Sequence, residues 1–249
     1  MLSKNQIKYI QSLGQKKFRD AEKVFLVEGP KSVHEFLTNP ATKIHQVYAV
    51  NEWCEKHSSN YPGIPITEVN DVELERISQL STPNQVLLIA AQYEEPADID
   101  PKGQWTLVLD TIQDPGNMGT ILRIADWFGI KQVVCSEDCA DWYNPKVVQS
   151  SMGSLGRLRL HRVPLHAWLG KWGQVPVYAA VLNGTPVQQV TRKSEGILLI
   201  GNESRGLELS VLEKANVKVT IPRIGEAESL NAAVATGILL SHLIENGSL

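Results

Sequence analysis

The chain has 249 residues, of which 43% are hydrophobic, enough for one large or two small domains with a real core. No apolar run reaches the ~20 residues of a membrane-spanning helix, and the first residues lack the apolar core of a signal peptide, so we expect no membrane association. Three cysteines are too few for a disulfide framework, so a reducing cytoplasm is the expected compartment.

Charge is distributed unevenly along the chain, although the net charge of −3 does not by itself indicate a nucleic-acid-binding protein. Residues 1–43 hold eight Lys and Arg against four Asp and Glu, residues 44–104 hold three against ten, and residues 105–249 hold thirteen of each. The first segment includes the cluster Lys16, Lys17 and Arg19, and such a patch can follow the phosphates of a nucleic acid. On charge alone, a solvated surface is the simpler interpretation.

The N-terminal part alternates strand-like and helix-like stretches, which is typical of an α/β protein. A helix is expected from Pro30 to Leu37, since proline is favoured in the first turn. Asn70 and Glu73 have the spacing of a capping box, which predicts another helix start. Strands are expected at residues 24–27, 47–50, 64–69 and 86–90.

Residues 94–103 interrupt this alternation. Two prolines and several acidic residues in this stretch predict an exposed linker. A second α/β pattern starts at Trp105, with strands expected at residues 107–110, 132–135, 177–181, 197–201 and 217–221. We therefore expect a first domain of residues 1–95, a linker of residues 96–104 and a second domain of residues 105–249.

The segment from Leu107 to Asp126 places a polar turn and an amphipathic helix directly after a strand. Asn117 is a residue type that caps helices well, so we expect the helix to begin there. Arg123 falls on the second turn, and its long side chain can lean back toward the helix start, where free amides favour anions. Asn117 and Arg123 therefore predict a phosphate or ribose site, with an ordinary capped surface helix as the structural alternative.

Two later segments combine polar loops with apolar elements. Gly201-Asn-Glu-Ser-Arg-Gly206 follows an expected strand, and its glycines permit a tight bend that carries Glu203 at the tip. Ser229-Leu230-Asn231 opens an almost wholly apolar helix and supplies side-chain oxygens for its free amides. Taken separately, each segment is also compatible with a purely structural turn or cap.

Together and in this order, these three segments resemble the motifs of the SpoU/TrmH-type RNA 2'-O-methyltransferases of the SPOUT superfamily. The resemblance implies a parallel-sheet α/β domain with a deep trefoil knot that binds S-adenosyl-L-methionine. By this resemblance, the cofactor pocket is lined by Gly201, Ile200, Ile221, Leu230 and Asn231. The catalytic residues that it implies are Asn117, Arg123, Glu203, Ser229 and Asn231. Ser204 and Arg223 depart from the glycine and the apolar residue that are usual there.

The N-terminal part resembles the same family through residues 14–19 and the following Val24–Gly29 segment. This implies a small α/β RNA-binding domain similar to certain ribosomal proteins, so Lys16, Lys17 and Arg19 are candidate RNA-binding residues. The family's usual glycine near the end of this domain is Gln85 here. The resemblance also implies a homodimer that pairs through the apolar C-terminal helix, with the active site near the interface.

The expected reaction methylates a ribose 2'-hydroxyl. The sulfonium donor is already activated, so no metal is expected, and the CxxxC spacing of Cys135 and Cys139 has no matching second pair. Arginine stays protonated, so we expect Arg123 to orient the target and stabilise developing negative charge rather than to act as a free base.

Other classes of α/β protein fit the sequence less well. The absence of GxGxxG, GxxxxGK[ST] and GxSxG signatures argues against an oxidoreductase, a P-loop enzyme and a hydrolase. Ribosomal RNA is the favoured substrate because simpler family members that act on transfer RNA often lack an N-terminal module. A transfer-RNA 2'-O-methyltransferase and a non-catalytic RNA-binding protein that keeps the fold stay open as alternatives.

Overall fold

The computed structural model describes residues 1–245, which form two compact units. Unit 1 comprises residues 1–94 together with residues 141–156, and unit 2 comprises residues 95–140 and the chain from Arg157 onward. The chain therefore passes from one unit to the other three times. Within residues 1–245, no helix has the length and apolar character needed to cross a membrane.

Unit 1 is built on a mixed four-stranded sheet in the order β1-β4-β2-β3, in which only β2 and β3 are parallel. Its strands are β1 (Val24–Glu28), β2 (Ile44–Val50), β3 (Ile66–Val69) and β4 (Val86–Ala91). Its helices are α1 (Lys4–Ser12), α2 (Lys16–Glu22), α3 (Pro30–Leu37), α4 (Asn51–His57), η1 (Ser58–Asn60), α5 (Asp71–Ile77) and α7 (Pro145–Ser151). The strands expected in this part of the sequence and the helix from Pro30 are confirmed, with ends that shift by a few residues.

Short-range signals in the sequence set two of these element ends. The predicted capping box of α5 is confirmed, since Asn70 Oδ1 accepts a hydrogen bond from Glu73 N at 2.9 Å and Glu73 Oε2 accepts one from Asn70 N at 3.3 Å. Gln85 has a φ of 57° just before β4, the left-handed conformation that glycine adopts most easily. The turn at the family's usual glycine is thus kept here by a residue with a side chain.

Residues 141–156 pack with unit 1, although they lie within the sequence of the expected second domain. Helix α7 lies against β1, and the Tyr143 ring packs on Phe25 with centroids 4.9 Å apart. The Tyr143 hydroxyl accepts a hydrogen bond from Tyr93 N at 2.8 Å, and Asp141 forms an ion pair with Arg19 at 2.5 Å. This segment therefore contributes both apolar and charged contacts to the first unit.

Unit 2 is built on a six-stranded sheet in the order β10-β8-β9-β5-β6-β7, with every neighbouring pair parallel. Its strands are β5 (Trp105–Leu109), β6 (Gln132–Cys135), β7 (Arg159–Arg162), β8 (Val177–Pro186), β9 (Gly196–Ile200) and β10 (Val217–Thr220). Its helices are α6 (Pro115–Trp127), α8 (Leu165–Gly170), η3 (Val187–Gln189), α9 (Leu209–Leu212) and α10 (Ala232–Leu243). The short helix η2 (Ser154–Arg157) lies where the chain returns to unit 2. The expected parallel α/β fold is confirmed, and β7 is a strand that the sequence did not indicate.

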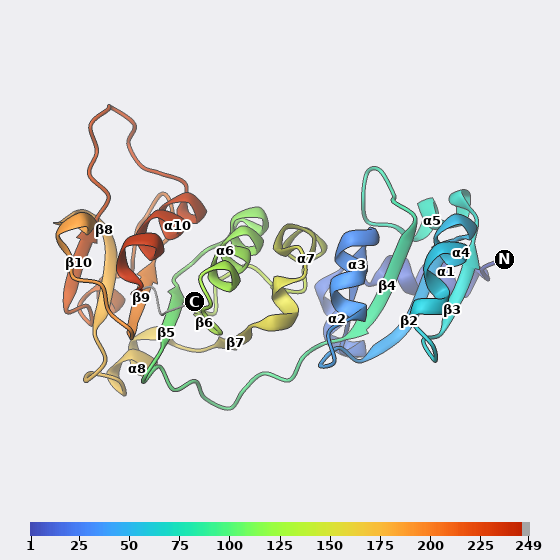
Figure 1. Cartoon of the computed structure of the whole chain (residues 1–249), viewed down its shortest axis with the longest axis horizontal. Helices are drawn as coiled ribbons and strands as arrows, with labels where there is room; N and C mark the ends of the chain where they lie inside the picture. The colour runs from blue at the N-terminus through green and yellow to red at the C-terminus, as the bar shows by residue number, and fades with distance from the viewer. Residues whose placement is uncertain (246–249) are drawn as a thin grey trace. The chain divides into compact units, whose positions relative to one another are not determined.

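Helices α6 and α10 pack against each other, and residues 221–231 form a long loop that projects between β10 and α10 (Figure 1). A Cβ atom at Gly237 of α10 would lie 3.8 Å from Ile124 Cδ1 of α6, so the two helices are in close contact. Helix α6 begins at Pro115 with Asp114 as its N-cap, whose side chain accepts a hydrogen bond from Asn117 N at 2.7 Å. The prediction that Asn117 caps this helix is wrong, because an aspartate before a first-turn proline takes that role.

The segment that joins β4 to β5 is mostly exposed, as predicted, but two of its residues are buried in unit 2. Ile99 is fully buried in a core cluster with Trp168, and Pro101 is buried as well. Asp98 fixes the segment by accepting hydrogen bonds from Trp168 Nε1 and Lys171 Nζ, both at 3.1 Å. The prediction of an exposed linker is therefore wrong at Ile99 and Pro101, because the surrounding acidic residues concealed an apolar anchor.

Candidate active site

The loops that follow β5 and β9 leave adjacent strands in opposite directions. β5 leads to α6 and then to β6 on one side, while β9 leads to α9 and then to β10 on the far side of β8. In parallel α/β sheets, such a reversal at the carboxyl ends of the strands is the usual place for a ligand. Asp110 joins the two loops, since its buried carboxylate accepts a hydrogen bond from Glu208 N at 2.7 Å.

The loop after β9 is held in a tight, defined shape. A Cβ atom at Gly201 would lie 2.4 Å from the carbonyl carbon of Gly206, so only glycine permits this close approach of two backbone segments. The Asn202 side chain donates from Nδ2 to Thr111 O at 2.9 Å and accepts from Ser204 N at 2.9 Å. These contacts fix the half-buried Glu203 at the loop tip.

Three polar side chains from separate parts of the sequence meet at this edge of the sheet. Asn117, in the first turn of α6, donates from Nδ2 to Glu203 Oε1 at 2.5 Å. Asn231 donates from its own Nδ2 to Asn117 Oδ1 at 2.8 Å. Asn231 is also the N-cap of α10, where its Oδ1 accepts from Ala233 N at 3.0 Å. The structure therefore brings together three of the five predicted catalytic residues in one hydrogen-bonded chain.

The other two predicted catalytic residues lie on the same elements but do not join this chain of hydrogen bonds. Arg123 is exposed on α6, six positions after Asn117, where its guanidinium faces solvent. Ser229 is exposed in the loop that precedes Asn231. Both side chains are therefore accessible from solvent.

The predicted cofactor-binding residues lie at the carboxyl ends of β9 and β10 and at the start of α10. Ile200 ends β9 and is buried, Gly201 follows it, and Ile221 is half-buried just after β10. Leu230 is 45% exposed directly before the α10 cap. Apolar side chains beside the polar Gly201 loop fit an adenosyl group, which needs both apolar contact and hydrogen-bonding partners.

The sequence did not indicate the roles of Asp110, Asp114 and Asn202, whose hydrogen bonds hold the loops and the helix that carry the network. Asp114 caps the helix that carries Asn117, and Asn202 ties the Glu203 loop to the backbone of Thr111. A signal was present for Asp114, because an aspartate before proline is a common helix start. Asp110 and Asn202 act through contacts between loops distant in sequence, which no local pattern indicates.

The two cysteines of the CxxxC segment lie beneath the loop that follows β5. Ile112 N donates a hydrogen bond to Cys139 Sγ at 3.4 Å, and both Cys135 and Cys139 are buried. Hydrogen bonding from the Cys135 thiol lowers the pKa of Cys139 to about 7. Within residues 1–245, no three His, Cys, Asp or Glu side chains are grouped as metal ligands.

The predicted RNA-binding cluster in unit 1 divides into exposed and buried members. Lys16 and Lys17 are exposed on α2, but Arg19 is only 1% exposed. Its guanidinium donates to Leu13 O at 2.9 Å and Gly14 O at 2.8 Å and forms the ion pair with Asp141. The interpretation of Arg19 as an RNA-binding residue is therefore wrong, because its charge is used inside the fold.

The sequence matches two known protein-family models, one in each half of the chain. Residues 104–241 match the SpoU rRNA Methylase family, and residues 4–88 match the MRM3-like substrate binding domain. The chain belongs to the SpoU rRNA Methylase family.

Its relatives in this family match both units. The chain is 34% identical over 245 residues to the 23S rRNA (guanosine(2553)-2'-O)-methyltransferase RlmP of Bacillus subtilis (strain 168), which covers 97% of each chain. A solved structure of an AdoMet-bound rRNA methyltransferase from Sinorhizobium meliloti is 32% identical, with a TM-score of 0.85 and coverage of 97% of this chain and 95% of that one. A TrmH-family protein structure from Porphyromonas gingivalis is 36% identical, with a TM-score of 0.84 and 98% coverage of both chains.

Proposed function

We propose that this protein is an S-adenosyl-L-methionine-dependent methyltransferase that methylates a ribose 2'-hydroxyl in ribosomal RNA. The observation that carries the proposal is the hydrogen-bonded chain of Asn117, Glu203 and Asn231, which joins three family motifs at the carboxyl edge of the sheet. Such a network preorganises polar groups around a reacting centre, and positioning supplies a large part of many enzymatic rates.

The chain's own residues have distinct tasks in this proposal. S-adenosyl-L-methionine, held by Gly201, Ile221 and Leu230, supplies an activated methyl group when bound. Arg123 binds the phosphate beside the target nucleotide and stabilises the negative charge that develops on the ribose oxygen. Asn117 holds Glu203 and Asn231 in place, so that the carboxylate presents a fixed acceptor toward the ribose. Ser229 contributes an exposed hydroxyl to the same loop.

Ribosomal RNA is favoured over transfer RNA as the substrate by the N-terminal unit. Residues 4–88 match a substrate-binding domain, and RlmP, which matches both units, is named for methylation of 23S rRNA. A transfer-RNA methyltransferase is the second candidate, and a non-catalytic RNA-binding protein is the third. A ribosomal substrate also favours the cytoplasm, where the free cysteines would stay reduced.

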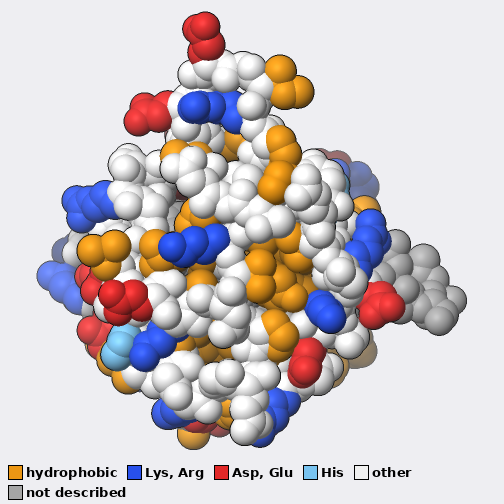
Figure 2. Space-filling model, turned by 90° about the vertical axis from the view of Figure 1, so that its left-hand side faces the viewer, with side chains coloured by type: hydrophobic (Ala, Val, Ile, Leu, Met, Phe, Trp, Pro, Cys, Tyr) orange, Lys and Arg blue, Asp and Glu red, His pale blue; other side chains and the backbone are white. Residues whose placement is uncertain are grey.

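We also propose that the protein is a homodimer and that its C-terminal chain forms the trefoil knot of the family. Trp127 of α6 is 85% exposed, and Val234 of α10 is 51% exposed, although these two helices pack together. Figure 2 views unit 2 from its β10 side and shows hydrophobic side chains gathered in the middle of that face. Large exposed apolar groups of this kind are typical of an interface with a second copy. The proposal of a knot rests on membership of the SpoU rRNA Methylase family.

The direct test of this function compares ribosomal and transfer RNA from cells with and without the gene. A methylated 2'-oxygen cannot attack the neighbouring phosphate, so methylated positions resist alkaline cleavage. We expect one alkali-resistant linkage in ribosomal RNA to disappear without the gene and to return when purified protein and cofactor are added. A linkage restored only in transfer RNA would select the second candidate, and cofactor binding without any restored linkage would select the third.

Arg123→Ala should reduce methyl transfer by ~10²–10³-fold, the usual loss when one donor to a developing oxyanion is removed. Its affinity for S-adenosyl-L-methionine, measured by titration calorimetry, should stay close to that of the unaltered protein, because the proposed Arg123 contacts are to RNA. Arg159→Ala is the matched control, since Arg159 is exposed in the same unit but starts β7, at the amino ends of the strands. An equal loss of cofactor affinity in Arg123→Ala would show instead that Arg123 supports the cofactor pocket.

A further inference from the structure

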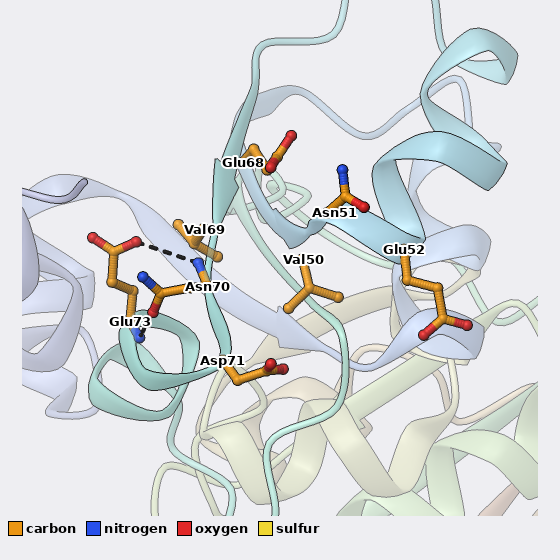
Figure 3. Close-up of a pocket in the computed structure, with 8 residues that line it drawn as sticks. All are labelled: Val50, Asn51, Glu52, Glu68, Val69, Asn70, Asp71 and Glu73. Carbon is orange, nitrogen blue, oxygen red and sulfur yellow. Dashed lines mark hydrogen bonds between the residues drawn. The ribbon is translucent and has the colours of Figure 1, made fainter.

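Unit 1 has surfaces of opposite charge. A cavity of about 460 Å³ at one of them is lined by the carboxylates Glu52, Glu68, Asp71 and Glu73 from α4, β3 and α5 (Figure 3). This surface repels phosphate groups. Helices α1 and α2, by contrast, expose Lys4, Lys8, Lys16 and Lys17. An RNA chain bound by unit 1 is therefore drawn to the lysines of α1 and α2 and away from the acidic cavity.

Buried Arg19 fixes which side of α2 faces solvent. Its guanidinium bonds to the carbonyls of Leu13 and Gly14 and to Asp141, all within unit 1. Arg19 is the buried residue of this short helix, so its neighbours Lys17 and Phe18 point toward solvent. Buried Arg19 thus fixes the orientation of α2, and Lys17 and Phe18 are presented on its exposed side.

Phe18 is an apolar ring in a polar, basic setting. It is 37% exposed, and the Lys17 ammonium lies 4.7 Å from its ring centroid. Lys16 is exposed one residue earlier and pairs with Asp20 at 2.9 Å, with side chains 61% and 44% exposed. The fold therefore leaves an aromatic ring partly exposed beside two lysines whose ammonium groups can reach phosphates.

We propose that Phe18 is a stacking platform for an unpaired RNA base, with Lys16 and Lys17 binding the phosphates on either side of it. This inference rests on the proposed RNA substrate and names the form in which unit 1 recognises it, a single-stranded loop or bulge. Proteins read such RNA by stacking exposed bases on aromatic side chains, while adjacent cations bind the backbone. Paired RNA would offer the lysines its phosphates but would leave no base free for the ring.

An apolar surface of a protein partner could contact Phe18 instead of an RNA base. The charges around Phe18 favour RNA. Two exposed lysines, Lys16 and Lys17, directly precede Phe18, whereas Val72, which is 58% exposed in the same unit, lies between Asp71 and Glu73. A phosphate chain matches the first setting and is repelled by the second. Val72 therefore provides an internal control for exposed apolar area without a basic surround.

The test uses the full-length protein and ribosomal RNA from cells that lack the gene. Binding is measured by filter retention at several salt concentrations, and methyl transfer is measured as KM and kcat. Phe18→Leu keeps the apolar side chain but removes the aromatic face, so the Kd for RNA and the KM should rise by about 5- to 150-fold, the equivalent of ~1–3 kcal/mol for one stacked base. The salt dependence of binding and the kcat at saturating RNA should not change.

Three further variants separate stacking from charge and from a loss of exposed apolar area elsewhere in unit 1. Phe18→Trp should bind RNA about as tightly as the unaltered protein, because a larger aromatic ring also stacks on a base. Lys17→Gln should weaken binding and flatten the log–log salt slope by about one unit. Val72→Ser should leave RNA binding unchanged, and thermal unfolding of each variant checks that unit 1 is intact.

The outcomes are decisive for the stacking role. Wild-type RNA affinity in Phe18→Leu, or weakened RNA binding in Phe18→Trp, overturns it, and the first result would leave an apolar protein partner as the remaining candidate for the ring. A fall in melting temperature that parallels the lost binding shows that Phe18 is structural, which also overturns it. If the unaltered protein methylates no RNA, the proposed function fails, while the RNA-binding measurements still decide whether Phe18 stacks a base.

Discussion

Asn117 shows why the site requires an amide side chain at this position. Its backbone amide is satisfied by the Asp114 cap, which leaves the whole side chain for the network. One end donates to Glu203 while the other accepts from Asn231. An aspartate could not donate to Glu203 and would add a like charge beside it, and a hydroxyl has too short a reach to join both partners. The two ends of one amide thus connect loops that are far apart in the sequence.

Arg19 illustrates the opposite case, a charged residue whose role is entirely internal. Its side chain is 2% exposed and pairs with Asp141, whose side chain is 15% exposed. Removing one partner of a buried ion pair leaves an uncompensated charge, and here it also leaves two backbone carbonyls without their donor. The pair thus holds residues 141–156 against α2, and the loss of either partner alone should destabilise unit 1.

Arg19→Met should destabilise the protein by ~3–5 kcal/mol, the usual cost of breaking a buried pair on one side. Urea unfolding followed by fluorescence measures this change. Lys16→Met is the matched control, because its exposed pair with Asp20 should contribute less than ~1 kcal/mol. Equal stability of the two variants would show that the Arg19 pair adds nothing to the fold, and would reopen an RNA-binding role for Arg19.

At this scale, the sequence predicted which residues matter better than it predicted what they do. Asn117, Glu203 and Asn231 were identified through their motifs and do meet in space. Asn117 was nevertheless assigned a capping role that Asp114 fills, because both residue types cap helices and only the backbone decides between them. Arg19 was misread because a sequence shows the charge of a residue but not the partner that neutralises it.

At the scale of elements, two short segments each complete the buried core of one unit. The stretch before β5 inserts Ile99 into a cluster with Trp168 and Leu169 of α8. Helix α7 covers β1 of unit 1 although it follows β6 of unit 2 in sequence. Each segment has few apolar residues, so neither gives a strong periodic signal, yet both are needed to complete a buried surface.

Ile99→Ala should destabilise unit 2 by ~2–5 kcal/mol, because it removes buried methyl groups and leaves a cavity beside Trp168. Denaturant unfolding of the full chain measures the loss, with Trp fluorescence reporting on the affected core. Ile224→Ala makes the same chemical change at a fully exposed position and should alter stability by less than ~0.5 kcal/mol. If the two variants unfold alike, the segment before β5 is not part of the core.

Much of the secondary structure was accessible from the sequence, since apolar strands such as β9 and the capping box of α5 are strong local signals. Strand β7 was not, because the sequence Arg159-Leu-His-Arg162 alternates only once between polar and apolar residues. It is a strand because β6 offers a free parallel edge for its backbone. Pairing of this kind depends on tertiary context and is not written in the four residues themselves.

At the scale of the whole molecule, the course of the chain argues against treating its two halves as independent pieces. We infer that residues 1–95 and 105–249 are the functional regions for RNA recognition and methyl transfer, but their folded boundaries are interleaved. A fragment that starts at residue 105 loses Ile99 from the core of unit 2. It also deprives Tyr143 and α7 of their contacts with β1. Domain roles are therefore better tested by point variants in the full chain than by truncation.

The full chain should be a homodimer. Helices α6 and α10 leave Trp127 and Val234 exposed, and exposed apolar side chains of this size are typical of a two-fold interface, which buries ~1,200–2,000 Å². Sedimentation at micromolar concentration should give twice the chain mass of 27.6 kDa. Val234→Glu should shift the protein toward monomer, because a charge in an apolar interface core is costly without a partner.

Leu209→Glu is the control for this prediction. Leu209 is 75% exposed on α9, which packs against α8 and not in the α6–α10 pair, so a glutamate there should leave the dimer intact. Asn231 caps α10 three residues before Val234. Dimerisation through α10 would therefore also fix the loop that carries Ser229 and Leu230. The monomeric Val234→Glu form should therefore bind S-adenosyl-L-methionine more weakly than the Leu209→Glu form. A species of single-chain mass for the unaltered protein would refute the dimer, and equal cofactor affinity in the two variants would separate dimerisation from the cofactor site.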